Sequence, residues 1–354
     1  MFNSLPLLAL VLVFLAAAAI VWVAGIRLSN TTDILSERFG LGEALGGLII
    51  LAMVTNLPEI AITSSAALSG SLGIAVGNIL GGIAIQTVVL VALDVFGVPD
   101  RPLTYRAASL VLVLEGALVI GVLGVVIMAS RLPASIIFAR VAPGGLLIAA
   151  LWVVGLLLLN RARNGLPWHE QGDAPDAQKG HNQAAAKKAQ EAKERDASTT
   201  RTVTVFVIAA LATLGAGVVL EESGNSIAGH VGLSGVLFGS TFLAASTALP
   251  ELSTGLASVK LGDYKLAFSD IFGGNAFLPV LFLLASVLSG RAVLPLAQNT
   301  DIYLTSLGIL LTMCYLWGLI FRPQRQFLRM GADSLAVLAL YVVGIGGLVA
   351  VAHG

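Results

Sequence analysis

Thr55-Asn56-Leu57-Pro58-Glu59 recurs in the second half of the chain as Thr247-Ala248-Leu249-Pro250-Glu251. Each copy lies in a stretch long and apolar enough to cross a membrane. The offset between the copies, 192 residues from Thr55 to Thr247, also relates the glycines that follow each motif. These glycines are Gly70 and Gly262, and the pairs Gly81-Gly82 and Gly273-Gly274. The chain therefore contains an internal duplication of a whole segment.

The motif combines two features that are costly in a membrane. A carboxylate at bilayer depth is expensive, and such groups face a protein interior or an aqueous cavity. The Pro beside it interrupts the helix and leaves a backbone carbonyl without its usual partner. Two interrupted segments at corresponding places are typical of a transporter whose ion site lies near the middle of the membrane.

Composition supports a membrane protein. The chain has 354 residues, of which 57% are hydrophobic and 11% charged, whereas a soluble domain carries roughly 25% charged residues. The partner expected from this composition is the lipid bilayer. Since the net charge is zero, no nucleic-acid partner is expected, and nothing in the sequence indicates an oligomeric state. The single Cys314 excludes an internal disulfide.

Ten apolar segments reach the length of about 20 residues that a membrane span requires. We predict spans at 5–26, 42–67, 72–96, 107–129, 141–159, 202–221, 232–257, 264–288, 301–321 and 332–352. The predicted fold is an all-α polytopic membrane protein of ten transmembrane helices, arranged as two inverted five-helix repeats. The first repeat covers 1–159, with its duplicated motif segment at 54–86. The second covers 202–354, with its motif segment at 246–278, and a polar loop at 160–201 joins them.

The distribution of charge predicts the orientation. Five spans in each half force the second half to enter the membrane from the opposite side, which inverts the repeats. With the N-terminus outside, all but three of the 20 Lys and Arg residues fall in internal loops. Arg131, Arg140 and Arg291 are the exceptions. Basic residues concentrate on the cytoplasmic side, so the loop at 160–201 is predicted to be cytoplasmic.

Glu59 and Glu251 are the predicted centre of a cation site. In each copy a Thr precedes the Glu by four residues, at Thr55 and Thr247, so both side chains share one face of a helix. Hard cations such as Ca²⁺ take six to eight oxygen ligands from carboxylates and carbonyls. The alternative is that each Pro only kinks a helix and each Glu pairs with a polar neighbour, but the duplication disfavours it.

Polar residues in the Gly-rich segments extend the predicted site. Asn78, Gln86, Asp270 and Asn275 fall within predicted spans, where polar groups need buried partners or a water-filled cavity. We expect at least two of them to line the ion path, whereas the glycines are interpreted as close helix contacts. Alternatively, Asp270 pairs with Lys265 or caps the start of its helix.

The other acidic groups have simpler readings. Glu115 lies inside the fourth predicted span without a duplicated partner, and a structural hydrogen bond is the preferred interpretation over a functional one. Glu221-Glu222 falls at the outer end of the sixth span and is read as a solvated mouth that could gather cations. The His residues show no metal-ligand spacing, so no transition-metal site or other cofactor is expected.

The duplicated motif, with its Gly-Asn/Asp-x-x-Gly segment, resembles the α-repeats of the Ca²⁺/cation antiporter superfamily, which includes the Na⁺/Ca²⁺ exchangers. The resemblance covers both motif segments and the five-plus-five layout. It implies alternating access, with Ca²⁺ exchanged for Na⁺ or H⁺ at sites built from the two repeats. It places the acidic ligands at Glu59 and Glu251, with Thr55 and Thr247 adding oxygens, and implies that spans one and six slide as gates.

Several positions depart from the family pattern. Na⁺-coupled relatives usually carry a hydroxyl after the motif Thr, where this chain has Asn56 and Ala248. The serines of their Gly-Ser-Asn stretches are absent, and Gln86 and Leu278 replace a common Asn or Asp. These changes disfavour several Na⁺ sites. Asn56 is similar to the H⁺-coupled branch, although the second repeat lacks its counterpart.

We therefore predict a secondary cation antiporter, not an enzyme, in a prokaryotic inner membrane. Its transported cations are Ca²⁺ and either Na⁺ or H⁺, which compete for Glu59 and Glu251. The alternative is a transport-incompetent paralogue that acts as a membrane ion sensor or partner subunit, because the ligand set is depleted. A membrane-embedded hydrolase is disfavoured, since the predicted spans contain no His and no paired Asp arrangement.

Overall fold

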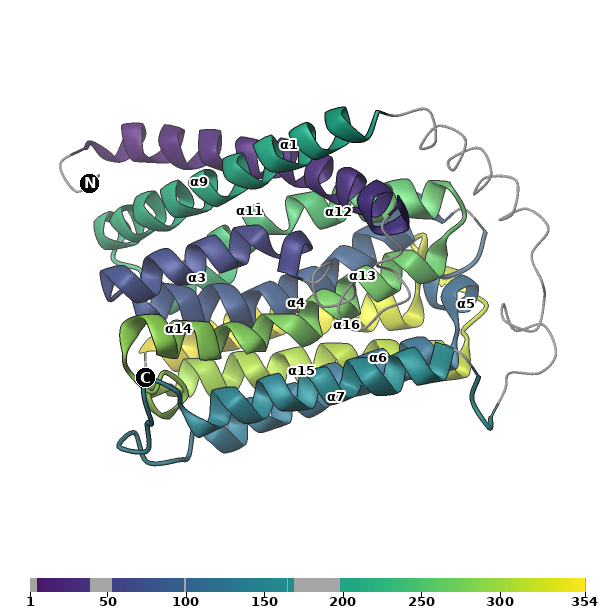
Figure 1. Ribbon diagram of the computed structural model, residues 1–354. Helices are drawn as coiled ribbons and strands as arrows, with labels where there is room; N and C mark the ends of the chain where they lie inside the picture. The colour runs from purple at the N-terminus through teal and green to yellow at the C-terminus, as the bar shows by residue number, and fades with distance from the viewer. Residues whose placement is uncertain (1–4, 39–52, 99, 164, 169–197, 354) are drawn as a thin grey trace.

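The computed structural model describes residues 5–38, 53–98, 100–163, 165–168 and 198–353. Within them, eight helices are long and apolar enough to cross a membrane. The fold is mostly helical (Figure 1), and its strands are one short antiparallel hairpin of β1 (Gln326–Phe327) and β2 (Met330–Gly331) in the described part. The chain is thus a polytopic helical membrane protein.

Several helices follow the predicted spans closely. In the first half these are α1 (Leu7–Arg38), α3 (Leu57–Ser69), α4 (Leu72–Gly97), α5 (Leu103–Ala107), α6 (Leu110–Ala129) and α7 (Pro143–Arg163). The second half contains α9 (Thr199–Val231), α10 (Gly235–Phe238), η2 (Gly239–Leu243), α11 (Ala244–Thr247), α12 (Leu249–Lys260), α13 (Tyr264–Phe277), η3 (Leu278–Val280), α14 (Leu281–Ser289), η4 (Leu294–Leu296), α15 (Asn299–Phe321) and α16 (Ala332–His353). The predictions for 72–96, 301–321 and 332–352 are confirmed within one or two residues.

Two predicted spans are divided at the duplicated motif. The span at 232–257 is divided at Ala248, where α11 ends and α12 begins, and it also contains the π-helical turn η2. The span at 42–67 is divided at Asn56, before α3, and its residues up to 52 lie outside the described part. Both breaks immediately precede the Leu-Pro step, because Pro lacks the N–H that would continue the helix. The ten-helix count and the inversion therefore stay predictions.

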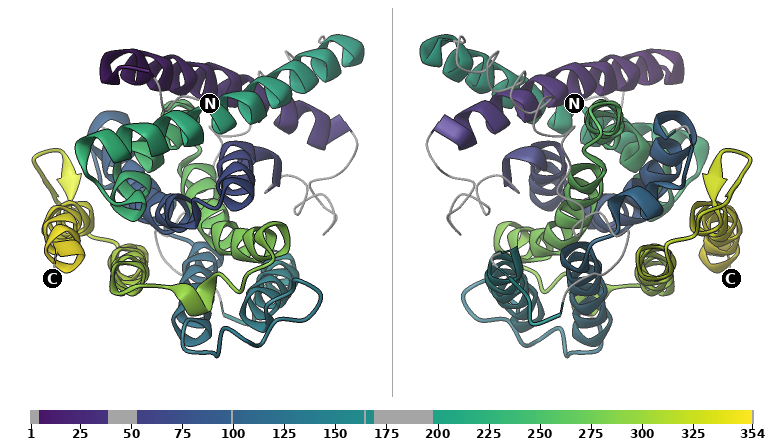
Figure 2. Two further views of the ribbon diagram at one scale, coloured as in Figure 1. Left: turned by 90° about the vertical axis from the view of Figure 1, so that its left-hand side faces the viewer. Right: turned by 90° about the vertical axis from the view of Figure 1, so that its right-hand side faces the viewer.

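The two longest helices form a layer of their own. α1 and α9 cross each other on one side of the molecule, above the broken helices (Figures 1 and 2). Both exceed the predicted spans: α1 continues to Arg38, and α9 continues ten residues beyond 221 to Val231. Helices longer than the bilayer is thick must tilt or project from it.

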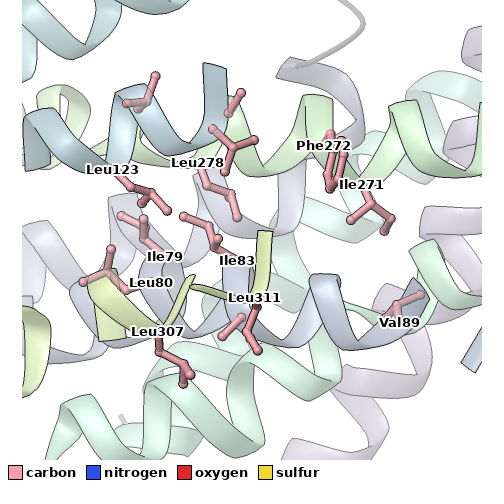
Figure 3. Close-up of a cluster of buried hydrophobic side chains, with 14 of the residues drawn as sticks. Ile79, Leu80, Ile83, Val89, Leu123, Ile271, Phe272, Leu278, Leu307 and Leu311 are labelled. Carbon is pink, nitrogen blue, oxygen red and sulfur yellow. The ribbon is translucent and has the colours of Figure 1, made fainter. Parts of the chain in front are cut away.

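The interior is apolar around the middle of α4. Ile79, Ile83, Leu123, Leu278 and Leu311 from four different helical segments meet there (Figure 3). α4 also approaches η2 at close range because its facing residues lack side chains: a Cβ on Gly81 would lie 2.6 Å from the Ser240 carbonyl oxygen. Small residues spaced four apart, here Gly77 and Gly81, permit this contact between helices. The apolar core thus packs α4 directly against the segment that precedes the second motif.

Candidate functional site

The first turns of α3 and α12 bring the two motif glutamates together. Pro58 and Pro250 stand in the first turn of their helices, where a missing N–H is not needed. The adjacent Glu59 and Glu251 are close enough for their charges to interact. Acidic groups near a helix start are favoured by its dipole, which partly offsets their burial.

The carboxylates have few hydrogen-bond partners. Glu59 is fully buried, and neither of its carboxylate oxygens has a partner; Oε2 of Glu251 also has none. The Thr247 hydroxyl lies beside the Glu59 carboxyl, but it donates to the Ala244 carbonyl at 3.2 Å. A buried carboxylate without partners is costly unless a cation or a proton occupies the site.

A third carboxylate lies on the Glu251 side. Asp270 of α13 is close enough to Glu251 for their charges to interact, and the Thr254 hydroxyl lies beside it. A small cavity of about 20 Å³ separates these groups from α1. It is lined by Gly25, Leu28, Ser29, Thr55, Pro58, Pro250, Glu251, Thr254 and Asp270. This space suffices for one water molecule or one ion.

Two amides from the first repeat complete this region. Gly274 of α13 faces both: an added Cβ would lie 3.5 Å from Gln86 Oε1 and 3.7 Å from Asn56 Oδ1. Both amides of the first repeat thus lie near α13 of the second repeat. The predicted residues Thr55, Asn56, Glu59, Gln86, Thr247, Glu251 and Asp270 therefore gather around the two broken helices.

The other two predicted polar residues differ in their contacts. The Asn275 amide donates to Thr87 Oγ1 at 3.2 Å and to the Ile83 carbonyl at 3.4 Å, so it joins α13 to α4. Its Oδ1 has no partner. Asn78 is fully buried in α4, and neither its oxygen nor its nitrogen has a partner. Asn275 thus has a structural use that its sequence position did not reveal.

The structure excludes one alternative for Asp270 and supports the preferred interpretation of Glu115. Asp263, not Asp270, caps α13, since its side chain accepts from the Leu266 N–H at 3.1 Å. The capping alternative for Asp270 is therefore wrong. Glu115 Oε1 accepts from Arg163 at 3.2 Å and from Ser269 at 2.9 Å, which confirms its interpretation as a structural hydrogen-bonding group.

The interpretation of Glu221 as part of a solvated mouth is wrong. The side chain is only 1% exposed, and Oε2 accepts from Ser65 at 2.8 Å. The prediction failed because the sixth span was ended at residue 221, whereas α9 continues to Val231 and buries this face against α3.

Each long helix contacts the motif of the opposite half through a glycine. A Cβ on Gly25 of α1 would lie 2.6 Å from Pro250 Cγ, and one on Gly217 of α9 would lie 3.1 Å from the Pro58 carbonyl oxygen. Gly25 and Gly217 are themselves 192 residues apart. The sequence analysis missed these glycines, along with Ser29 and Thr254. Only the offset could have found the glycine pair, and Thr254 only by its place three residues after Glu251.

The helices define a polytopic membrane protein with buried acidic groups between two broken helices. The sodium/calcium exchanger protein family model matches residues 9–169 and 201–348. The chain therefore belongs to this family, within the Ca²⁺/cation antiporter superfamily, whose members are antiporters rather than enzymes.

Two curated proteins resemble most of the chain. The inner membrane protein YrbG of Escherichia coli K12 is 26% identical over 298 residues, which span 83% of this chain and 84% of the relative. The putative antiporter CaxA of Alkalimonas amylolytica is 28% identical over 274 residues, 77% of each chain. The similarity thus extends well beyond the duplicated motifs.

Solved structures share the fold. The H⁺/Ca²⁺ exchanger CAX aligns with a TM-score of 0.65 at 15% identity, covering 94% of this chain and 81% of that one. A sodium-calcium exchanger structure, NCX_Mj in 2.5 mM Na⁺ and 1 mM Sr²⁺, aligns with a TM-score of 0.58 at 18% identity, covering 95% and 97%. At these identities the likeness concerns the arrangement of the helices.

Proposed function

We propose that this protein is a secondary active antiporter that exchanges Ca²⁺ for Na⁺ or H⁺ by alternating access. The observation that carries the proposal is the meeting of Glu59 and Glu251, from two halves of the chain, with three of their four carboxylate oxygens unpartnered. A buried acidic pair of this kind is stable only with a cation or protons in place. Ca²⁺ and the coupling ions then exclude one another from the same carboxylates.

The remaining ligands would come from neighbouring oxygens. Thr55 and Thr247 precede the glutamates, while Asp270 adds a third negative charge on the Glu251 side. Pro58 and Pro250 leave the carbonyls four residues earlier without their helical partners. Together these groups approach the six to eight oxygens that Ca²⁺ takes. Asn56 supplies an amide oxygen where Na⁺-coupled relatives carry a hydroxyl, and Gln86 supplies one where the family commonly carries Asn or Asp.

The inverted arrangement of the repeats is part of the proposal. It is supported by the exchange of equivalent contacts: Gly25 of the first half meets Pro250, and Gly217 of the second half meets Pro58. In the proposed cycle, α1 and α9 move along these glycine contacts and expose the site to one side of the membrane at a time. The proposed location is a bacterial inner membrane, with the N-terminus outside.

The test is Ca²⁺ uptake into proteoliposomes of the purified protein under an outward Na⁺ gradient or an outward H⁺ gradient. We expect uptake in one arm, and its loss in Glu251→Gln and in Glu59→Gln. The active arm identifies the coupling ion. Absence of uptake in both arms, with the protein shown to be folded and inserted, would contradict Ca²⁺ antiport and favour the transport-incompetent paralogue.

A further inference from the structure

A second buried acidic group lies between α3 and α9, outside the proposed exchange site. Glu221 is 1% exposed, its Oε2 accepts from Ser65 at 2.8 Å, and its Oε1 has no partner. The Ser69 hydroxyl lies near the same carboxylate, and so does the charge of Glu222. One oxygen of this buried carboxylate therefore has no hydrogen-bond partner, which is costly unless a cation or a proton compensates it.

A cavity of about 520 Å³ lies beside Ser65 and Ser69 and is bordered by Glu222, whereas the Glu221 side chain is not part of its wall. Its lining residues are Ile60, Ala61, Ser64, Ser65, Leu68, Ser69, Leu214, Val218 and Glu222. It extends along α3 from Ile60, the residue after Glu59, to Ser69 in the last turn of that helix. The serine hydroxyls on its wall can hold water or a hydrated ion along this route.

α3 and α9 place Glu221 a fixed distance beyond Glu59. They run side by side in the same direction, because Gly217 contacts Ala61, Glu221 contacts Ser65, and Asn225 donates to Ser71 at 3.0 Å. Ser65 follows Glu59 by six residues, or about 9 Å at 1.5 Å per residue. Such a spacing suits a binding step before the exchange site.

The equivalent position in the first half carries no charge. The residue 192 positions before Glu221 is Ser29, which lines the small cavity beside Glu251. The acidic group therefore serves only one of the two approaches to the exchange site. With the central loop cytoplasmic, as proposed, this is the outer approach.

We propose that Glu221, Ser65 and Ser69 form an outer loading site for the transported cation. The carboxylate and two hydroxyls provide too few oxygens to dehydrate Ca²⁺, so the ion binds here with part of its water shell. Occupancy of this site raises the local cation concentration next to Glu59. This inference rests on the proposed function for its role in transport, although binding itself is testable separately.

Equilibrium binding of ⁴⁵Ca²⁺ to the purified full-length protein tests the site. In the Glu59→Gln/Glu251→Gln double variant we expect a weaker remaining site that a further Glu221→Gln substitution removes. Glu115→Gln is the control, because it removes another buried carboxylate that lies outside this cavity. Remaining binding that Glu221→Gln leaves intact, or that both substitutions weaken equally, would overturn the proposal.

Transport measured from each side of the membrane distinguishes a loading site from a purely structural contact between α9 and α3. In right-side-out vesicles, Glu221→Gln should raise the Ca²⁺ concentration for half-maximal uptake by about tenfold, within the range of field effects on local ion concentration. Everted vesicles should show no change. Ser65→Ala removes the hydrogen bond but keeps the charge, so it should have a much smaller effect.

The outcomes also distinguish the two proposals. Equal changes on both sides, or a Ser65→Ala effect as large as that of Glu221→Gln, would mean that the contact is structural. If the wild type transports no Ca²⁺ but the binding that remains in the double variant depends on Glu221, the loading site holds and the antiport proposal fails. If the wild type transports Ca²⁺ and Glu221→Gln changes nothing, only the loading site fails.

Discussion

At the scale of single residues, the two motif glutamates follow the same Leu-Pro step in sequence but have different neighbours in space. Asp270 lies beside Glu251, whereas the equivalent position in the first half is Asn78, 192 residues earlier. The negative charge around the proposed site is thus concentrated on the Glu251 side. Divalent ions gain more from this additional charge than monovalent ions do.

Asp270→Asn should therefore weaken the binding of Ca²⁺ more than the binding of the coupling ion. We expect the Ca²⁺ concentration for half-maximal uptake to rise about tenfold, equivalent to about 1.4 kcal/mol, while Ca²⁺-independent cation exchange changes less. Concentration dependence in proteoliposomes measures both. Asn275→Asp, on the same helix, is the charge-adding comparison. An equal loss for both ions would show that Asp270 acts on the fold rather than on selectivity.

Glu115 provides the contrasting case of an intramembrane acid with a structural role. Glu115→Gln weakens its contacts with Arg163 and Ser269, and hydrogen bonds to charged groups contribute about 1.5–3 kcal/mol. We expect a lower thermal unfolding temperature in detergent, with an unchanged Ca²⁺ dependence of transport. A shifted Ca²⁺ dependence at unchanged stability would instead place Glu115 in the ion path.

The sequence revealed these residues to different degrees. Duplication located Glu59 and Glu251, because an energetically costly residue that occurs in both repeats is expected to have the same function in each. It gave no signal for Thr254, which lies outside the motif, and it misplaced Glu221, since apolar composition does not mark where a long helix leaves the bilayer. The contacts of Asn275 with α4 depend on how helices from separate halves pack, which no local pattern encodes.

At the scale of elements, the glycine contacts of α1 and α9 are the joints between the long helices and the motifs. Glycine within a helix costs about 1 kcal/mol relative to alanine, so a helix is expected to retain it only for close approach. Gly25 meets Pro250 and Gly217 meets Pro58 and Ala61. The same glycines would permit the sliding proposed for these helices.

Gly217→Ala should slow transport by at least about tenfold, because its methyl group would lie 2.7 Å from Ala61 Cβ and force α9 away from α3. Gly215→Ala is the control on the same helix, since its Cβ meets none of the described atoms within 4 Å. The control should transport normally. Comparable rates for the two variants would show that close contact at this joint is dispensable.

Asp94 holds together the end of the bundle that contains α5 and the hairpin. Its Oδ1 accepts from the Leu103 N–H and its Oδ2 from the Gly331 N–H, both at 2.7 Å. Ser286, at the equivalent position in the second half, accepts from Val293 at 3.4 Å. Both repeats thus use a polar residue near the end of a helix to fix the following loop.

We expect Asp94→Asn to lose one of these bonds, because an amide nitrogen cannot accept. An unsatisfied buried N–H costs about 1–3 kcal/mol, so faster amide hydrogen exchange should appear at Leu103 or Gly331. Ser286→Ala is the milder comparison, because the hydrogen bond that it removes is longer and its acceptor is an uncharged hydroxyl. Unchanged exchange at both amides would contradict the bracing role.

At the scale of the whole molecule, the described loops gather at two ends, in the same two groups that the predicted topology separates. The predicted internal loops meet: Arg322 donates to the Tyr105 carbonyl at 3.3 Å, and Gln326 to the Val98 carbonyl at 3.5 Å. The predicted external loops meet as well, since a Cβ on Gly290 would lie 3.8 Å from Arg140. The N- and C-termini lie at one end of the molecule, opposite α5 (Figure 1).

Orientation itself is testable by labelling single cysteines in a Cys314→Ala background. Pro167→Cys and Gln324→Cys, both exposed, should react with a membrane-impermeant maleimide only in everted vesicles. Ser135→Cys, exposed in the loop between α6 and α7, should react only in right-side-out vesicles. The predicted orientation rests on the retention of Lys and Arg on the cytoplasmic side. Because the predicted internal loops of both halves meet, this orientation applies to both halves. Labelling of Pro167→Cys and Ser135→Cys from the same side would contradict the topology, and with it the assignment of Glu221 to the outer approach.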